Sequence, residues 1–373
     1  MFKQIPLVDE KEPTPPYYLK VENHFPWKNG RELFIKKVYS VSYDIPCRGI
    51  VIMAPGIATN ANIFRMNLDG DFLSLDNNRS FANLLASEGF HVYLYHPGYT
   101  ERVHNRYVTK YCKQSVYFQK HYSIPRTLSF SELINRELPI LMDFVKQDSG
   151  VKQISWIGYS LGGLIIYSYL SKYRDSSIKN IITIGSPISL TQRFIRIIPY
   201  INILSQGLGF EESSFLGIFS NNLVPITRIL GIIPLWFIRY NFLTLLLFNP
   251  LNMSNESIRR LLGNVIEPIP ASLQIHFAEL IRRGYSAQKK HSHYLRSLRM
   301  LRKTDKHFLF FYGSDDALSP PDSVFLAREL INPNDINNLI EVRSTGHIDL
   351  ICGDHAFDKV WKPSLEWLKA RVA

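Results

Sequence analysis

The sequence predicts an α/β fold with a mostly parallel central sheet, helices on both faces of it, and an inserted helical cap. Short apolar strands alternate with helices over residues 31–187, and the same alternation returns over 305–373. Such alternation produces βαβ units, whose parallel sheet is buried on both faces. Residues 188–304 lack this alternation, are rich in Ile, Leu and Phe, and are typical of several helices. We therefore expect an N-terminal arm (1–30), a core in two parts, and a cap between them.

Each predicted strand is a short apolar run that stops at a turn residue, and each predicted helix has apolar residues at helical spacing. In the first core part we expect strands over 31–41, 48–56, 91–98, 152–158 and 180–187, and helices over 80–90, 129–150 and 161–173. The helix over 129–150 begins with a capping box of Ser129 and Glu132 and ends at Gly150. In the second part we expect strands over 307–313 and 338–345, and helices over 319–330 and 356–372.

The composition is that of a globular protein with an uneven charge distribution. Hydrophobic residues make up 46% and charged residues 20% of the 373 residues, which excludes a disordered or collagen-like chain. The net charge is +11, and residues 188–304 hold fourteen Lys and Arg against five Asp and Glu. The basic character therefore belongs to the cap and indicates an acidic partner, which is nucleic acid, an anionic membrane surface or an anionic substrate.

Cysteine usage and the N-terminus indicate a cytoplasmic protein. The three cysteines, Cys47, Cys112 and Cys352, lie far apart, which excludes a disulfide framework and a Cys-only zinc site. The N-terminal stretch carries acidic residues and prolines where a secretion signal needs an apolar run of roughly 7–15 residues. The most apolar stretch, 226–248, is interrupted by charges and a proline, so we expect it to be interfacial or buried, with a membrane span as the alternative.

A G-x-S-x-G motif, Gly158-Tyr159-Ser160-Leu161-Gly162, carries the first chemical signal. It follows a predicted strand and opens a predicted helix, as a nucleophile elbow requires. The sharp turn forces Ser160 toward positive φ, and the glycines on either side prevent clashes. Ser160 is therefore the candidate nucleophile, and the N–H of Leu161 faces a developing oxyanion. A glycine-rich turn without chemistry is the alternative.

A serine nucleophile needs a base and an orienting carboxylate, which follow it along the chain in the order acid, then base. The strand over 307–313 leads into Asp315 and Asp316, and the strand over 338–345 leads into His347. Two consecutive strand ends of one parallel sheet lie side by side, so these groups can converge. His355, the other histidine after the acidic loop, is expected at the last helix, too far from this edge.

The loop after the strand over 48–56 is the natural source of a second oxyanion donor. Gly56 allows a sharp turn, and the N–H of Ile57 follows it. Losing one such donor typically costs about 3–4 kcal/mol of transition-state stabilisation. Asn60 either braces this loop by hydrogen bonding or simply forms an Asn-type turn.

These motifs, APGIATN, GYSLGG, YGSDDALSP and STGHIDLICG in this order, resemble the α/β-hydrolases. The closer resemblance is to acid and gastric lipases, and the cap phrase LLLFNPLNMSNESIRRLLGNVIEPIP is similar to polyhydroxyalkanoate synthase and depolymerase relatives. The resemblance covers roughly 45–190 and 305–368 well and the cap only in patches. It implies Ser160 as nucleophile, Asp316 as acid, His347 as base, and an oxyanion hole from Ile57 and Leu161.

The resemblance also implies that Asp349 is structural, and it leaves Asp315 as the substitute for Asp316. The usual His-Gly of the oxyanion loop is Pro55-Gly56 here, which keeps the N–H donor and removes an imidazole. The polymer synthases use a cysteine nucleophile, so Ser160 favours hydrolysis over chain growth. The digestive lipases are secreted, whereas no secretion signal is expected here.

We therefore expect a serine hydrolase that cleaves carboxylic esters of lipids through an acyl-enzyme, with no metal and no organic cofactor. The apolar runs of the cap suit either a thick buried layer or a lid that contacts lipid, with Arg193, Arg196, Arg228 and Arg239 reaching anionic head groups. Nucleic acid is not expected as a partner, because the basic residues stand among aliphatic runs. The alternatives are an acyltransferase or polyester depolymerase with the same triad, and a non-catalytic membrane-binding protein on a hydrolase scaffold.

Overall fold

The structure is a computed structural model that describes residues 18–28, 31–41, 45–66, 72–74, 80–100, 128–188, 235–240, 242–267, 273 and 297–372. Its strands are β1 (Tyr18–His24), β2 (Trp27–Lys28), β3 (Arg31–Glu32), β4 (Phe34–Ser40), β5 (Gly49–Ala54), β6 (Phe72–Ser74), β7 (Phe90–His96), β8 (Ile154–Tyr159), β9 (Ile178–Ile184), β10 (His307–Gly313) and β11 (Leu339–Val342). Its α-helices are α1 (Phe81–Ser87), α4 (Phe130–Glu132), α5 (Leu138–Ser149), α6 (Leu161–Tyr173), α9 (Leu235–Tyr240), α10 (Phe242–Leu247), α11 (Asn255–Arg260), α14 (Pro321–Ile331), α15 (Asp349–Cys352) and α16 (Lys362–Val372).

Short 3₁₀ turns cover Ala61–Arg65, Pro250–Asn252, Met300–Lys303 and Ile336–Asn338, and wider π turns cover Leu133–Glu137, Leu261–Val265 and Phe357–Trp361. Nine of the described strands form one sheet in the order β11-β10-β9-β8-β5-β7-β4-β1-β6. The six strands from β11 to β7 run parallel, and β4, β1 and β6 extend the sheet with antiparallel pairings. The predicted mostly parallel sheet is therefore confirmed.

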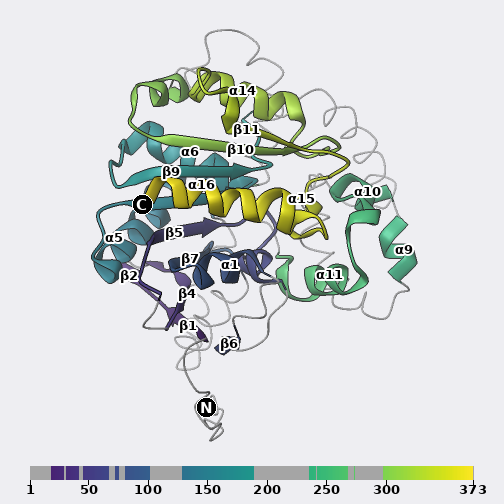
Figure 1. The fold of residues 1–373 in the computed structure, drawn as a ribbon, viewed down its shortest axis with the longest axis horizontal. Helices are drawn as coiled ribbons and strands as arrows, with labels where there is room; N and C mark the ends of the chain where they lie inside the picture. Colours follow the sequence, from purple (N-terminus) through teal and green to yellow (C-terminus); the bar gives the residue numbers. More distant parts are fainter. Residues whose placement is uncertain are drawn as a thin grey trace, which may run out of the picture.

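Helices cover both faces of this sheet (Figure 1). Alternate residues of β5 show the division: Ile50 and Ile52 pack with α5, α6 and α14, whereas Val51 and Met53 pack with α1 and α16. Successive side chains of a strand point to opposite faces, so a strand that is apolar throughout needs a helix layer on each side. The predicted two-sided arrangement is confirmed.

The antiparallel edge contains a strand, β1, within residues 1–30, where the sequence predicts an N-terminal arm. Tyr18–His24 forms β1 and pairs with β4 along six residue pairs. Leu19 and Val21 are buried while Lys20 and Glu22 are more exposed, which is the period-two pattern of a half-buried strand. This alternating pattern is short and follows a proline-rich stretch, so the sequence alone favours an extended arm over a strand here.

The predicted helix over 129–150 is present, with its capping box and with Gly150 in the left-handed conformation at its end. The helix widens to a π turn over Leu133–Glu137. Pro139, two residues after this turn, has no N–H to donate to it, which accounts for a break in the regular hydrogen-bond pattern at this place. The irregular turn directs Glu137 into the interior, where it is fully buried.

The described part of the cap lies at the carboxyl ends of the parallel strands, where α9, α10 and α11 stand near α15 (Figure 1). None of the helices within the described ranges has both the length and the hydropathy needed to cross a bilayer. Of the apolar stretch 226–248, the described residues form the short helices α9 and α10.

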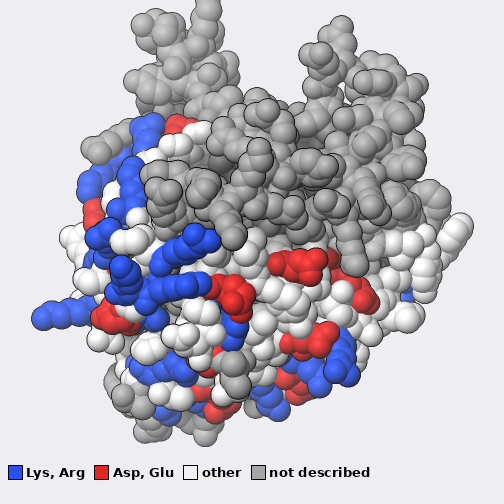
Figure 2. All heavy atoms as spheres, turned by 90° about the horizontal axis from the view of Figure 1, so that it is seen from above, with Lys and Arg blue, Asp and Glu red and all other residues white. Residues whose placement is uncertain are grey.

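Charges of both signs occur on the described surface. In the face drawn in Figure 2, Lys and Arg gather toward one side and acidic side chains stand among them. Several charged residues in the described part of the chain form ion pairs, such as Lys37 with Asp148 at 2.8 Å and Lys146 with Asp175 at 3.0 Å. The prediction that the excess charge belongs to the cap concerns residues that lie mostly outside the described ranges.

Candidate active site

Ser160 occupies the sharp turn between β8 and α6. Its backbone has φ 50° and ψ −110°, a left-handed conformation that L-residues avoid. Its N–H donates to the carbonyl of Ile184 on the neighbouring strand (2.9 Å), and its carbonyl accepts from the N–H of Gly163 (3.0 Å). These hydrogen bonds hold the strained residue in place, as expected for a nucleophile elbow.

The glycines of the motif are required by close packing. A Cβ on Gly158 would lie 2.5 Å from the carbonyl carbon of Gly162, and a Cβ on Gly162 would overlap the carbonyl group of Ala54 at the end of β5. A side chain at either position would push α6 away from the sheet. The predicted reason for the glycines, close approach of the backbone, therefore matches the structure.

His347 and Asp316 form a buried pair on two neighbouring loops. Asp316 follows β10 and His347 follows β11, and the His347 Nδ1 lies 2.7 Å from the Asp316 Oδ2. His347 is 5% and Asp316 3% exposed. The other carboxylate oxygen of Asp316 accepts from the backbone N–H groups of Leu318 (2.9 Å) and Ser319 (2.7 Å). The carboxylate is therefore held in one orientation, with one oxygen directed at the imidazole.

Asp315, the alternative acid, points elsewhere. Its side chain is exposed and accepts a hydrogen bond from the hydroxyl of Ser314 at 3.0 Å. His355, the other histidine in this part of the chain, is exposed as well. Of the two aspartates that could orient the histidine, Asp316 is the one hydrogen-bonded to His347.

Contacts around Gly185 bring Ser160 into the same small region. Tyr159, the residue before Ser160, has its ring 5.1 Å from that of His347, and its hydroxyl donates to the His347 carbonyl at 3.2 Å. Gly185 adjoins the strand end that binds the Ser160 N–H, and a Cβ added there would lie 3.2 Å from Asp316 Oδ2 and 3.4 Å from His347 Cε1. The backbone of Ser160 thus lies close to the His347–Asp316 pair, at the carboxyl ends of β8, β10 and β11; that the Ser160 hydroxyl reaches the imidazole stays a prediction.

The loop after β5 approaches Ser160 closely at Gly56. A Cβ on Gly56 would lie 2.9 Å from the Tyr159 ring and 3.2 Å from the Ser160 Cβ, so only glycine allows this approach. The N–H of Ile57 follows directly, and no described group accepts a hydrogen bond from it. Leu161 begins α6, and the N–H groups of a first helical turn have no acceptor within the helix. Gly56, directly before Ile57, and Leu161 therefore both adjoin Ser160, and the two N–H groups as oxyanion donors stay a prediction.

Asn60 fulfils both alternatives left open by the sequence, because its side chain forms an Asn-type turn and also braces the loop after β5. Its side-chain oxygen accepts from the N–H of Asn62 (2.9 Å), while its amide donates to the carbonyl of Asn264 (2.9 Å) and to Glu267 (2.6 Å). A bridge between Thr59 and Ile266 joins the same segments. The end of the described cap segment is thus attached to the loop that carries Ile57.

The beginning of the same cap segment is attached to the histidine loop through Asp349. The buried Asp349 accepts from the Asn252 amide (2.7 Å) and from the N–H groups of Gly346 (3.2 Å) and Asn249 (3.3 Å). Burial raises the pKa of Asp349, and these hydrogen bonds partly oppose that rise. Asn249 and Asn252 were not singled out in the sequence, although their spacing beside a proline is a recognisable turn signal.

The described residues contain no group of three or more His, Cys, Asp or Glu that could hold a metal ion. The chemistry available at this place is that of a buried histidine and carboxylate beside a strained serine. Such an arrangement can remove a proton from a hydroxyl and stabilise negative charge with backbone N–H groups.

Comparisons with known proteins agree with this architecture. Residues 49–200 match a family model described as alpha/beta hydrolase fold. A comparison with curated proteins gives no match. Among solved structures, the chain is similar to the peroxisomal alpha-beta-hydrolase Lpx1 from Saccharomyces cerevisiae, with 11% identity, a TM-score of 0.54, and coverage of 96% of this chain and 90% of that one.

Two bacterial structures are similar to the same extent. Bromoperoxidase from Bacillus anthracis has 15% identity, a TM-score of 0.53, and coverage of 93% of this chain and 100% of that one. An esterase from Exiguobacterium antarcticum has 16% identity, a TM-score of 0.51, and coverage of 94% and 99%. At these identities the likeness shows the fold alone, and the chain has the α/β-hydrolase fold. The resemblance to acid lipases and polyhydroxyalkanoate enzymes stays a prediction.

Proposed function

We propose that this protein is a serine hydrolase that cleaves carboxylic esters of lipids, with Ser160 as nucleophile, His347 as base and Asp316 as acid. The observation that carries the proposal is the buried His347–Asp316 hydrogen bond of 2.7 Å beside a serine held at positive φ. A buried pair of this kind orients an imidazole, and a serine at positive φ presents its hydroxyl at the edge of the sheet.

The proposed reaction proceeds through an acyl-enzyme. With the Nδ1 proton directed at Asp316, the Nε2 of His347 takes the proton of Ser160 while the Ser160 Oγ bonds to the ester carbonyl carbon. The N–H groups of Ile57 and Leu161 stabilise the resulting oxyanion. His347 returns the proton to the leaving alcohol as the carbon–oxygen bond breaks. Water then repeats the sequence and releases the carboxylic acid.

Exposed apolar side chains near the strand ends support a lipid as the substrate class. Trp236 and Tyr240 on α9, Leu245 on α10 and Leu251 after it are all at least half exposed, with Leu251 at 78%. Exposed apolar residues gathered beside a candidate active site are typical of surfaces that contact lipid. The segment 188–304 would then act as a cap over the site, with an ester-bound acyl chain between cap and core.

The basic cap further supports peripheral contact with an anionic membrane. Of the four arginines expected to reach lipid head groups, Arg193, Arg196 and Arg228 lie outside the described residues. Arg239 is described, and its guanidinium donates to the carbonyl of Met253 at 2.5 Å. The proposed membrane contact therefore depends on the exposed apolar side chains of α10 and of the turn after it. Basic residues elsewhere in the cap would add attraction to anionic head groups.

The proposal predicts different effects on soluble and membrane-borne esters. The double substitution Leu245→Ser with Leu251→Ser should lower hydrolysis of a palmitate ester carried in anionic phospholipid vesicles about thirtyfold, because each exposed leucine contributes roughly 1 kcal/mol when it enters lipid and tenfold corresponds to about 1.4 kcal/mol. Hydrolysis of a soluble butyrate ester should change by less than about twofold. Initial rates on both substrates, compared with the unsubstituted protein, provide the measurement.

Met300→Ser is the matched control, because Met300 is also an exposed apolar residue but lies at the end of the cap segment, in the turn Met300–Lys303 that packs on α6 and α14. It should leave both rates unchanged. Equal rates of the double variant and the unsubstituted protein on vesicles would contradict the membrane contact. An unsubstituted protein that hydrolyses butyrate and no longer-chain ester would contradict the lipid substrate.

A further inference from the structure

Two buried hydroxyl groups hold the carbonyl of Gly56, the residue before the proposed oxyanion donor. The hydroxyl of Tyr99 donates to this carbonyl at 3.3 Å, and that of Thr59 at 3.0 Å. The Gly56 carbonyl and the Ile57 N–H belong to one peptide group, and the described backbone contains only trans peptide bonds. In a trans peptide the two groups point in opposite directions. Fixing the carbonyl on one side therefore aims the N–H to the other.

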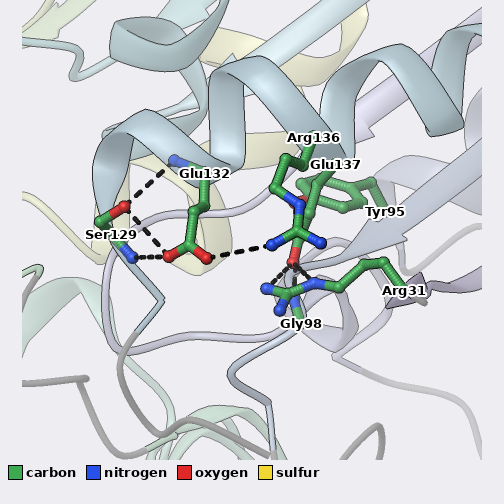
Figure 3. A network of polar contacts seen from close by, with 7 residues as sticks. All are labelled: Arg31, Tyr95, Gly98, Ser129, Glu132, Arg136 and Glu137. Atoms are coloured by element: carbon green, nitrogen blue, oxygen red, sulfur yellow. Dashed lines mark hydrogen bonds and ion pairs between the residues drawn. The ribbon is translucent and has the colours of Figure 1, made fainter. Parts of the chain in front are cut away.

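Tyr99 is in turn held by a buried acidic residue. Glu137, which is fully buried, accepts a hydrogen bond from the N–H of Gly98 at 3.0 Å, directly before Tyr99. The hydroxyl of Tyr95 donates to the same carboxylate oxygen. The guanidinium of Arg31 donates to the other oxygen from Nε (2.9 Å) and from its terminal nitrogen (2.5 Å). Figure 3 shows Arg31, Tyr95 and Gly98 gathered around Glu137.

The backbone at Gly98 packs closely against the Glu137 carboxylate. A Cβ on Gly98 would overlap the Glu137 carboxylate, so the loop can pack here only with glycine at this position. The helix that carries Glu137 is anchored at its start by the Ser129–Glu132 capping box, drawn in the same view (Figure 3). The position of the Glu137 carboxylate is therefore fixed both by its own helix and by the residues that bind it.

The charges in this network favour the observed hydrogen bonds. Burial by itself lowers the pKa of Arg31, but the charge and hydrogen bonds of Glu137 outweigh it and raise that pKa, so the arginine stays a donor. Burial raises the pKa of the Tyr99 hydroxyl, and the charges of Glu267 and Glu137 add to this effect. Tyr99 therefore keeps its proton and can donate it to the Gly56 carbonyl.

We propose that Tyr99 is a positioning residue for the oxyanion hole, and that Glu137 positions Tyr99 through the Gly98 N–H. The inference rests on the proposed hydrolysis at Ser160 with Ile57 as oxyanion donor. Tyr99 does not touch the substrate: it fixes the direction of a donor that does. A donor aimed in advance stabilises charge that develops in the transition state, so its loss appears in kcat more than in KM.

The test is the substitution Tyr99→Phe, which keeps the ring and removes only the hydroxyl. For a soluble butyrate ester we expect kcat to fall about tenfold, the scale of one hydrogen bond, with KM within about twofold. Labelling of Ser160 by an uncharged fluorophosphonate should slow by a similar factor, because it also develops negative charge on an oxygen in the hole. Tyr167→Phe is the matched control, since it removes another buried hydroxyl, bonded to Thr183 at 2.8 Å. It should leave kcat unchanged.

A second variant tests the link to Glu137. Glu137→Gln should lower kcat at least as much as Tyr99→Phe, and adding Tyr99→Phe to it should cause little further loss, because the two residues act in one chain. An unchanged kcat in Tyr99→Phe, or an equal fall in Tyr167→Phe, would overturn the inference and leave the proposed function standing. An unsubstituted protein that neither hydrolyses the ester nor reacts with the fluorophosphonate would overturn both.

Discussion

Replacing Ser160 with alanine is expected to lower kcat for ester hydrolysis by about 10⁴-fold or more, because the bond-forming oxygen is removed. The fold should persist: alanine is smaller than serine and tolerates the φ of 50° no worse, and the Ser160 contacts with Ile184 and Gly163 are made by backbone atoms. Steady-state kinetics and a thermal melt of the purified variant provide the measurement. A midpoint within a few degrees of the unsubstituted protein would assign the loss to chemistry.

Ser186→Ala is the matched control for this substitution. Ser186 is also buried at this end of the sheet, and its hydroxyl donates to the carbonyls of Gly158 and Ile184, both at 3.3 Å. It should lose stability on the scale of one hydrogen bond, about 1 kcal/mol, with kcat within a few-fold. Substantial ester turnover by Ser160→Ala would remove Ser160 from the mechanism.

Asp316→Asn is expected to lower kcat by about 10⁴-fold with little change in the fold. The N–H groups of Leu318 and Ser319 would bind the asparagine oxygen, as they bind one carboxylate oxygen now. The NH₂ group would then face the Nδ1 of His347 and act as a donor there. The imidazole would carry its proton on Nε2 and could no longer accept the proton of Ser160.

Asp315→Asn separates this effect from a general change of charge on the same loop. Its side chain is exposed and, among the residues that the structure describes, is hydrogen-bonded only to the Ser314 hydroxyl, so kcat should stay within about twofold. The two variants change the same net charge one residue apart, and comparison of their kcat values is the measurement. A large loss in Asp315→Asn with an active Asp316→Asn would reverse the assignment of the acid.

The parallel part of the fold could be predicted because its strands are apolar throughout and its helices have clear ends. Ile154–Tyr159 and His307–Gly313 are both strands where the sequence predicted them. The motif around Ser160 could be placed because it stands between a predicted strand and a predicted helix. Its two glycines allow the close backbone approach that such a turn needs. The choice between Asp316 and Asp315 needed the loop geometry, because neighbouring residues differ in direction and not in chemistry.

Other features depended on contacts between distant segments. Strand β1 is stabilised by the burial of Leu19 and Val21 in the core, and β6 is a three-residue strand between the predicted strand over 48–56 and the predicted helix over 80–90. The role of Glu137 requires Arg31 and Gly98, which lie 106 and 39 residues away along the chain. No local pattern distinguishes such a glutamate from a surface residue of an amphipathic helix.

The attachment of the cap to the core is another feature of this kind. Asn252 binds the histidine loop through Asp349, and Asn264 binds the loop after β5 through Asn60. One short stretch of the cap thus supports both sides of the candidate site. Asparagines in a loop are common turn residues, so their sequence position alone does not reveal this use.

The central claim is that Ser160 is activated by His347 and Asp316, and the reaction of the native protein with a fluorophosphonate tests it most directly. Only an activated serine hydroxyl attacks the phosphorus, and the adduct is located by mass spectrometry of the digested protein. The account predicts a single stoichiometric adduct on Ser160, strongly reduced in Asp316→Asn and absent in Ser160→Ala. A folded protein that stays unmodified, or one modified at a different serine, would contradict it.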